Sequence, residues 1–157
     1  MRKLDASIVG RSCPVTRIRV EAAQLMMFLN SVGADESIFH DLNLVESAGF
    51  RRAPIPAEYL FVLHRLSAKE PDECWLQLGI EDDRVEPRAQ TCTYFAQISV
   101  GDVLTFTTRI VSVMDSESGD TTSVTQLVEV ENQGNVHVAD MLLDFAVRNP
   151  PPEVLIN

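Results

Sequence analysis

The chain has 157 residues, 45% of them hydrophobic, and a mean hydropathy of +0.02. It is therefore long enough for one domain with a sizeable buried core. Thirteen basic against 23 acidic residues give a net charge of −10. We expect no nucleic-acid binding from so acidic a chain, because duplex affinity depends largely on Lys and Arg neutralising phosphates. The same charge disfavours a peripheral role on anionic membranes.

No run of 18 apolar residues is present, so no transmembrane helix is expected, and the basic N-terminus lacks the apolar stretch of a signal peptide. The three cysteines are Cys13, Cys74 and Cys92. Their spacing is typical of neither a disulfide framework nor a zinc site. We therefore expect no metal, and a cytoplasmic protein whose cysteines are reduced and buried as small residues.

The first half of the chain predicts one strand and two helices. Residues Pro14 to Val20 are typical of a short strand. From Glu21 to about Val32, apolar residues recur at helical spacing, which predicts a helix ended by Gly33. After an irregular polar stretch over 35–50, Pro54 and Pro56 open a second helix that ends near Ala68.

In the second half the hydrophobic period changes from 3.6 to 2, which predicts antiparallel strands. A long strand carries four apolar residues on one face, namely Leu104, Phe106, Ile110 and Met114. Two further long strands follow over 121–131 and 136–148, each after a turn. Two more strands are expected at Cys74–Ile80 and Gln90–Ser99.

Helices first and long antiparallel strands later is an α+β order. The economical packing is a strongly curved antiparallel sheet wrapped around a long central helix, which is the hotdog fold. We expect residues 1–150 to form this single domain and residues 151–157 to form an extended tail after the prolines.

Common phosphate-loop, dinucleotide and metalloprotease motifs are missing from the sequence. The one compact cluster of titratable residues runs from Asp35 to Asp41 and contains His40. A histidine beside a carboxylate can act as a base with its orienting partner. Composition alone favours solvated loop residues here, and His64 and His137 are expected to serve packing or the surface rather than catalysis.

The segment 33–41, the Ala48-Gly49-Phe50 that follows it and the proline-rich turn over 53–59 together resemble the MaoC-like (R)-specific hydratase/dehydratase superfamily, most closely its N-terminal-type domain. Later stretches over 93–104, 109–113 and 128–134 are similar to the family as well. The resemblance covers about residues 14 to 148. It implies a hotdog enzyme that hydrates or dehydrates an acyl thioester, with an aspartate and a histidine five residues apart handling the water.

The resemblance allows two alignments of this catalytic pair. Without gaps, the aspartate position falls on Ala34 and the histidine position on Phe39, and neither residue can transfer a proton. A shift of one residue brings Asp35 and His40 to the same spacing. The ungapped alignment is favoured, and it implies a degenerate half that shapes the acyl tunnel for a catalytic MaoC-like partner.

The resemblance also implies a substrate slot at the start of the central helix, with Pro56, Ala57 and Tyr59 as its residues and the Ala57 N–H against the thioester carbonyl. No cofactor is expected, since the substrate arrives on coenzyme A or acyl carrier protein. Basic residues near this helix are candidates for coenzyme A phosphates, although surface solvation explains them equally well; they are Arg51, Arg52 and Arg65.

Three alternatives to the degenerate subunit stay open. The first is a self-sufficient homodimeric hydratase that uses Asp35 and His40. The second is a non-enzymatic module that binds acyl thioesters, and a hotdog thioesterase with Glu58 at the helix start is a distant third. Dimerisation, with itself or with a catalytic MaoC-like chain, is expected in each case, because a single sheet leaves an edge strand and half a tunnel open.

Overall fold

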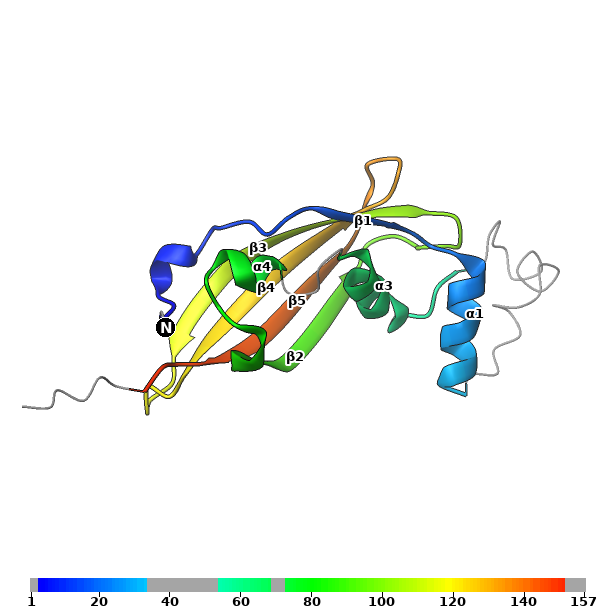
Figure 1. Ribbon diagram of the computed structural model, residues 1–157. Helices are drawn as coiled ribbons and strands as arrows, with labels where there is room; N and C mark the ends of the chain where they lie inside the picture. Colours follow the sequence, from blue (N-terminus) through cyan, green and yellow to red (C-terminus); the bar gives the residue numbers. More distant parts are fainter. Residues whose placement is uncertain (1–2, 34–53, 69–72, 152–157) are drawn as a thin grey trace, which may run out of the picture.

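The computed structural model describes residues 3–33, 54–68 and 73–151. Five antiparallel strands form one curved sheet in the order β1-β3-β4-β5-β2, with bounds β1 Thr16–Arg19, β2 Val85–Tyr94, β3 Val103–Asp115, β4 Thr121–Glu131 and β5 His137–Arg148. The helices are α1 Ala22–Ser31, α3 Tyr59–Ser67 and α4 Glu73–Gln77, with short 3-10 turns at Ala6–Ile8 and Asp82–Arg84. Figure 1 shows α3 and α4 against one face of the sheet and α1 at one end of the molecule. The predicted α+β hotdog architecture is confirmed.

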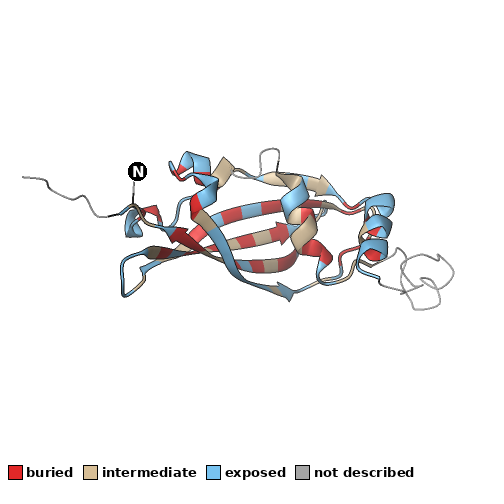
Figure 2. Ribbon diagram, turned by 60° about the horizontal axis from the view of Figure 1, so that its bottom comes forward, coloured by how far each residue is buried: buried red, intermediate tan, exposed pale blue. Residues whose placement is uncertain are grey.

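The three long strands form where hydrophobic alternation predicted them. Along β4 every second residue from Thr122 to Val130 is buried, and the intervening residues are exposed or half-buried. Side chains in a strand alternate between the two faces, so the buried set lines the concave face under the helices. Figure 2 shows this alternation as red and pale bands along the sheet.

The prediction for Met114 is wrong. A register shift lies between Ile110 and Ser112 where β3 pairs with β4. One extra residue turns the rest of a strand over, so Met114 is 67% exposed while Val113 packs against the core. Hydrophobic alternation does not reveal a bulge.

The central helix α3 has nine residues, and it is therefore shorter than the long helix expected. Its inner face buries Tyr59, Leu60 and Leu63 completely or nearly so. These side chains join the main core, which includes Phe106 and Met141 on the concave face of the sheet and also Leu25 and Leu29 of α1.

The expected strand at Cys74–Ile80 is instead the short helix α4 and a turn after it. Trp75 and Leu78, three residues apart, bury together with the N-terminal residues Leu4 and Ile8. Spacing of three and four residues is helical, and this tertiary contact decides the conformation. The strand expected at Gln90–Ser99 is β2, which begins earlier, at Val85, and ends at Tyr94.

The cysteine prediction also needs correction. Cys13 and Cys74 form a disulfide, and Cys92 is free and half-buried. The two bonded residues are 61 apart in sequence, and their Cα atoms lie 5.0 Å apart. No spacing rule identifies such a pair, because only the packing of α4 against the segment before β1 brings the sulfurs together.

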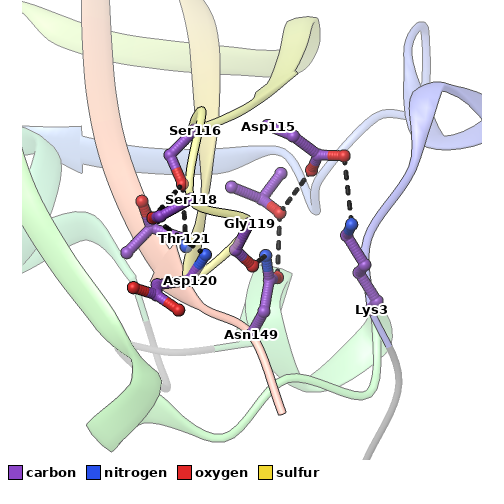
Figure 3. Close-up of polar contacts among 9 residues, drawn as sticks. Lys3, Asp115, Ser116, Ser118, Gly119, Asp120, Thr121 and Asn149 are labelled. Carbon is purple, nitrogen blue, oxygen red and sulfur yellow. Dashed lines mark hydrogen bonds and ion pairs between the residues drawn. The ribbon is translucent and has the colours of Figure 1, made fainter. Parts of the chain in front are cut away.

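The end of the sheet at the β3–β4 turn is held by a polar cluster (Figure 3). The buried hydroxyl of Thr122 lies 3.0 Å from Asp115 Oδ1 and 2.9 Å from Asn149 Oδ1. Lys3 Nζ lies 3.1 Å from Asp115 Oδ2. Asn149 also donates to the backbone carbonyl groups of Gly119 and Asp120. We call Lys3, Asp115, Thr122 and Asn149 the turn clamp, and it ties both ends of the described chain to the same hairpin.

None of the helices in the described residues is long and apolar enough to span a membrane. The division into a domain over 1–150 and a tail stays a prediction.

Candidate functional site

The chain enters α3 through a turn that exposes a backbone donor. The Tyr59 N–H donates to the Pro56 carbonyl at 3.1 Å. Peptide bonds in the described residues are trans, and in a planar trans peptide the N–H points opposite to the C=O. Since the Pro56 carbonyl faces the helix, the N–H of Ala57 faces away from it. Ala57 is exposed, and its N–H has no hydrogen-bond partner in the described part of the chain.

Tyr94, at the end of β2, fixes this turn from the side of the sheet. Its hydroxyl donates to the Ala57 carbonyl. Burial raises the pKa of Tyr94, and the neighbouring Cys92 and Glu58 raise it further. The phenol therefore stays protonated and keeps donating over the whole physiological range. The donor at Ala57 is thus positioned by a side chain from another element.

Tyr59 occupies a different environment from Pro56 and Ala57. Its side chain is 1% exposed and packs against the ring of Phe28, with ring centroids 5.0 Å apart. Its hydroxyl is buried without a hydrogen-bond partner among the described residues, and burial raises its pKa. Tyr59 therefore lies in the core, while Pro56 is half-buried and Ala57 is at the surface.

A surface hollow adjoins the same turn. It is lined by Ile55 and by five residues at and after the end of β2, namely Tyr94, Phe95, Ala96, Gln97 and Ile98. Ile55 is held there by a backbone hydrogen bond to Ile98 of 3.0 Å. The free Ala57 donor, an apolar hollow and the edge strand β2 therefore lie together at one corner of the sheet.

The candidate catalytic residues Asp35 and His40, and the alternative positions Ala34 and Phe39, lie outside the described residues. Arg51 and Arg52 lie outside them as well. Arg65 is described, is exposed, and lies in the last turn of α3 rather than beside Ala57.

Sequence reasoning missed a cavity of about 320 Å³ between the sheet, α3 and α4. Its walls include Phe61, Trp75 and Leu143, and its polar lining includes His64 of α3, Thr108 of β3 and Gln126 of β4. The sequence could have indicated Thr108 and Gln126. Each is a polar residue at a position where the alternation of its strand predicts a buried apolar side chain. Thr108 falls between Phe106 and Ile110 on that face.

His64 is a neutral group in this cavity. Its ring lies 5.1 Å from that of Phe106. Burial lowers the pKa of His64 to about 4, so the imidazole is uncharged at neutral pH and offers one donor and one acceptor nitrogen. His64 packs against Phe106, as expected of a packing histidine. Its position on the cavity wall was not expected.

His137 is at the surface, as expected, but it is paired. Its Nε2 lies 2.6 Å from Asp140 Oδ1, and this hydrogen bond raises the pKa of His137. The ring also contacts Phe95 of the surface hollow, with centroids 4.8 Å apart. Within the described ranges, no group of three His, Cys, Asp or Glu side chains could hold a metal ion.

Comparison with known proteins supports the same fold and family. A family model described as the FAS1-like dehydratase domain region matches residues 7–141. A UPF0336 protein of Streptomyces avermitilis is 27% identical over 150 residues, which cover 92% of this chain and 95% of that protein.

Two solved structures show the same fold at low sequence identity. A MaoC-like dehydratase from Rhodospirillum rubrum has a TM-score of 0.70 at 18% identity and covers 92% of this chain and 94% of its own. A chain of the C-terminally truncated HadBC (3R-hydroxyacyl-ACP dehydratase) complex from Mycobacterium tuberculosis has a TM-score of 0.72 at 15% identity, covering 90% and 99%. The chain therefore belongs to the family of FAS1-like dehydratase domain regions, and it has the hotdog fold of the MaoC-like dehydratase and the HadBC chain.

Proposed function

We propose that this chain is a subunit of an acyl-thioester hydratase or dehydratase, and that it shapes the acyl site for a catalytic MaoC-like partner. The observation that carries the proposal is the free Ala57 N–H at the start of α3, positioned by Tyr94 beside an apolar hollow. A positioned backbone donor stabilises the negative charge that develops on a thioester oxygen during proton removal. No cofactor would be required, because the substrate would arrive as a thioester of coenzyme A or acyl carrier protein.

The partner would pair along β2. This strand is at the edge of the described sheet and eight of its ten residues are exposed. A long exposed edge strand presents backbone donors and acceptors to a second sheet. The adjoining Phe95 and Leu142 are exposed apolar side chains, 56% and 42%, which a partner would cover. The similar HadBC structure is a complex by its description.

The division of labour is tested by assaying the purified chain alone and after co-expression with a MaoC-like hydratase from the same organism. Hydration of crotonyl-CoA is followed by loss of the enoyl absorbance, and the mass of each species by light scattering. We expect a stable heteromer, with activity only in that heteromer. Hydration by the chain alone would overturn the degenerate role, and Asp35→Asn with His40→Ala would then show whether those residues carry it.

The role of Ala57 is tested in the active heteromer by Ala57→Pro, which removes the N–H at the second position of the Pro56–Tyr59 turn, where proline is favoured. Loss of one such donor lowers kcat by about 100-fold or more. Ala57→Gly keeps the N–H and is the matched control, expected to stay within a few-fold of the wild type. Equal activity of the two variants would show that the carbonyl is polarised elsewhere.

If the heteromer forms but neither it nor the chain alone turns over any enoyl thioester, the chain is a binding module. Retained binding of crotonyl-CoA in calorimetry would then support that reading.

A further inference from the structure

The cavity between α3, α4 and the sheet combines apolar walls with polar side chains that make few hydrogen bonds to the described part of the chain. Thr108 and Gln126 are each 5% exposed, and both lie in the inward phase of their strands. The Gln126 side chain has one contact among the described residues, a weak one from Nε2 to Cys74 Sγ at 3.7 Å. The Thr108 hydroxyl and the His64 ring nitrogens have no hydrogen-bond partner within the same residues.

These three residues meet in one place. In the β3–β4 register, Gln126 is opposite Ile110 and Thr108 is opposite Val128. Thr108 and Gln126 are therefore diagonal neighbours on the concave face, within reach of one small molecule. His64 approaches from α3 on the opposite wall, and all three line the same cavity.

Polar side chains are uncommon on the buried face of a strand. The neighbouring positions of the same face carry Phe106, Val124 and Val128, all fully buried. A cavity of about 320 Å³ has the size of a small ligand site. Apolar walls, a cavity and a few polar side chains are typical of a ligand-binding site and not of a packed core.

The charges around the cavity limit what can reach its floor. Four charged residues line it, of which Arg65 and Asp82 are exposed and Glu73 and Asp144 are half-buried. The buried floor holds only neutral groups, because His64 is uncharged at neutral pH. A buried ion without a partner is costly, so the part of a ligand that enters must itself be neutral.

We propose that this cavity binds an uncharged organic group with an apolar body and a hydroxyl, carbonyl or amide that hydrogen-bonds to Thr108, Gln126 and His64. The site does not depend on thioester chemistry. If the proposed function is correct, the bound group is the distal part of the acyl substrate, and the chain selects acyl groups that carry a polar substituent over plain aliphatic ones.

The single tryptophan of the chain, Trp75, lines the cavity and reports its occupancy. Binding of hexan-1-ol and of 1-fluorohexane is followed by Trp75 fluorescence. The probes share a chain, but only the alcohol donates a hydrogen bond. We expect the alcohol to bind about fivefold more tightly, the equivalent of one neutral hydrogen bond. Neither probe is a thioester, so this result is independent of the hydratase assay.

Thr108→Val and Gln126→Leu, combined in one variant, should remove the preference between the two probes. Thr107→Val is the matched control, since Thr107 is exposed on the opposite face of the same strand, and it should keep the wild-type preference. Equal affinity of the wild type for both probes, no Trp75 response to either, or a preference that survives in the double variant would each overturn the proposal.

Discussion

Buried threonines at the two ends of the curved sheet differ in their hydrogen bonding. At the β3–β4 turn, Thr122 is fully buried and its hydroxyl lies between two oxygen acceptors of the turn clamp. Under α3 and α4, Thr108 is almost as buried, and its hydroxyl faces a cavity without a partner in the described structure. The two strands are paired neighbours with the same alternation.

The difference separates polar groups that hold the fold from polar groups available to a ligand. A buried hydroxyl with partners contributes to stability, and its removal leaves those partners unpaired. A hydroxyl that faces a cavity has no protein partner among the described residues, so its removal leaves no group unpaired. Each prediction below tests one side of this contrast, from the largest expected effect to the smallest.

The Cys13–Cys74 disulfide lies at the end of the sheet that carries the cavity, and not at the end that carries the turn clamp. Replacing Cys13 and Cys74 together by alanine frees a loop of about 60 residues in the unfolded chain, which lowers the free energy of unfolding by about 4 kcal/mol in the chain-entropy treatment. Urea denaturation with and without reductant measures it. Cys92→Ala, which removes the free cysteine, should leave the reductant sensitivity of the wild type unchanged. If reductant does not lower the free energy of unfolding of the wild type, the stabilising role of the Cys13–Cys74 disulfide is contradicted.

The neutral state of His64 makes the cavity end sensitive to acid. The pKa is lowered from 6.5 to about 4 in the folded state, so between these values the unfolded chain binds the extra proton. Stability is therefore unaffected by this group well above pH 6.5, and the free energy of unfolding falls by about 3 kcal/mol as the pH drops to 4.

His64→Gln isolates this effect, because it keeps a neutral polar side chain at the site. The other charged residues lining the cavity, Arg65, Glu73, Asp82 and Asp144, remain in both proteins. The difference in free energy of unfolding between wild type and variant, measured in urea from pH 7.5 to 4, should change across this window. A constant difference would mean that His64 titrates normally.

The two threonines give the most direct comparison. Thr122→Val should lower the free energy of unfolding by about 1–2 kcal/mol, since it leaves Asp115 and Asn149 without their shared donor. Thr108→Val should change it by less than about 0.5 kcal/mol, or raise it, because no partner is lost. Equal losses in thermal or urea unfolding would abolish the distinction between the two regions.

The smallest effect concerns the exposed part of the turn clamp. The hydrogen bonds from Lys3 and Thr122 hold the pKa of Asp115 below its ordinary value of 3.8. Stability from this contact is present above pH 3.8 and is lost as the pH falls through the lowered pKa. Lys3→Met should raise the pKa of Asp115 toward 3.8 in a carboxyl NMR titration. Lys69→Met removes the same charge elsewhere in the sequence and serves as the control.

Much of the fold was predictable because local patterns were strong. The strands β4 and β5 and the helix α1 appear within one residue of their expected ends. The strand expected at Cys74–Ile80 failed for a physical reason. Over so short a stretch, its apolar residues fit both the strand period of 2 and the helix period of 3.6. Only the packing of Trp75 and Leu78 against the N-terminal residues selects a helix.

The candidate site was predictable in part. Pro56 and Ala57 follow from the resemblance of the helix start to the family, and the structure adds that Tyr94 fixes the turn. Tyr94 is 37 residues from Ala57, so no local pattern links them. Asp35 and His40 stay predictions, since they lie outside the described residues.

The sequence by itself determined the class of fold, the family, and the buried face of each long strand except beyond the bulge in β3. These properties depend on periodicity and on motifs within a few residues, which a single chain displays directly. Tertiary structure alone decided the Cys13–Cys74 link, the bulge that exposes Met114, and the cavity that joins His64, Thr108 and Gln126. Each depends on contacts between segments far apart in the chain, and the free energy of those contacts is absent from any local window.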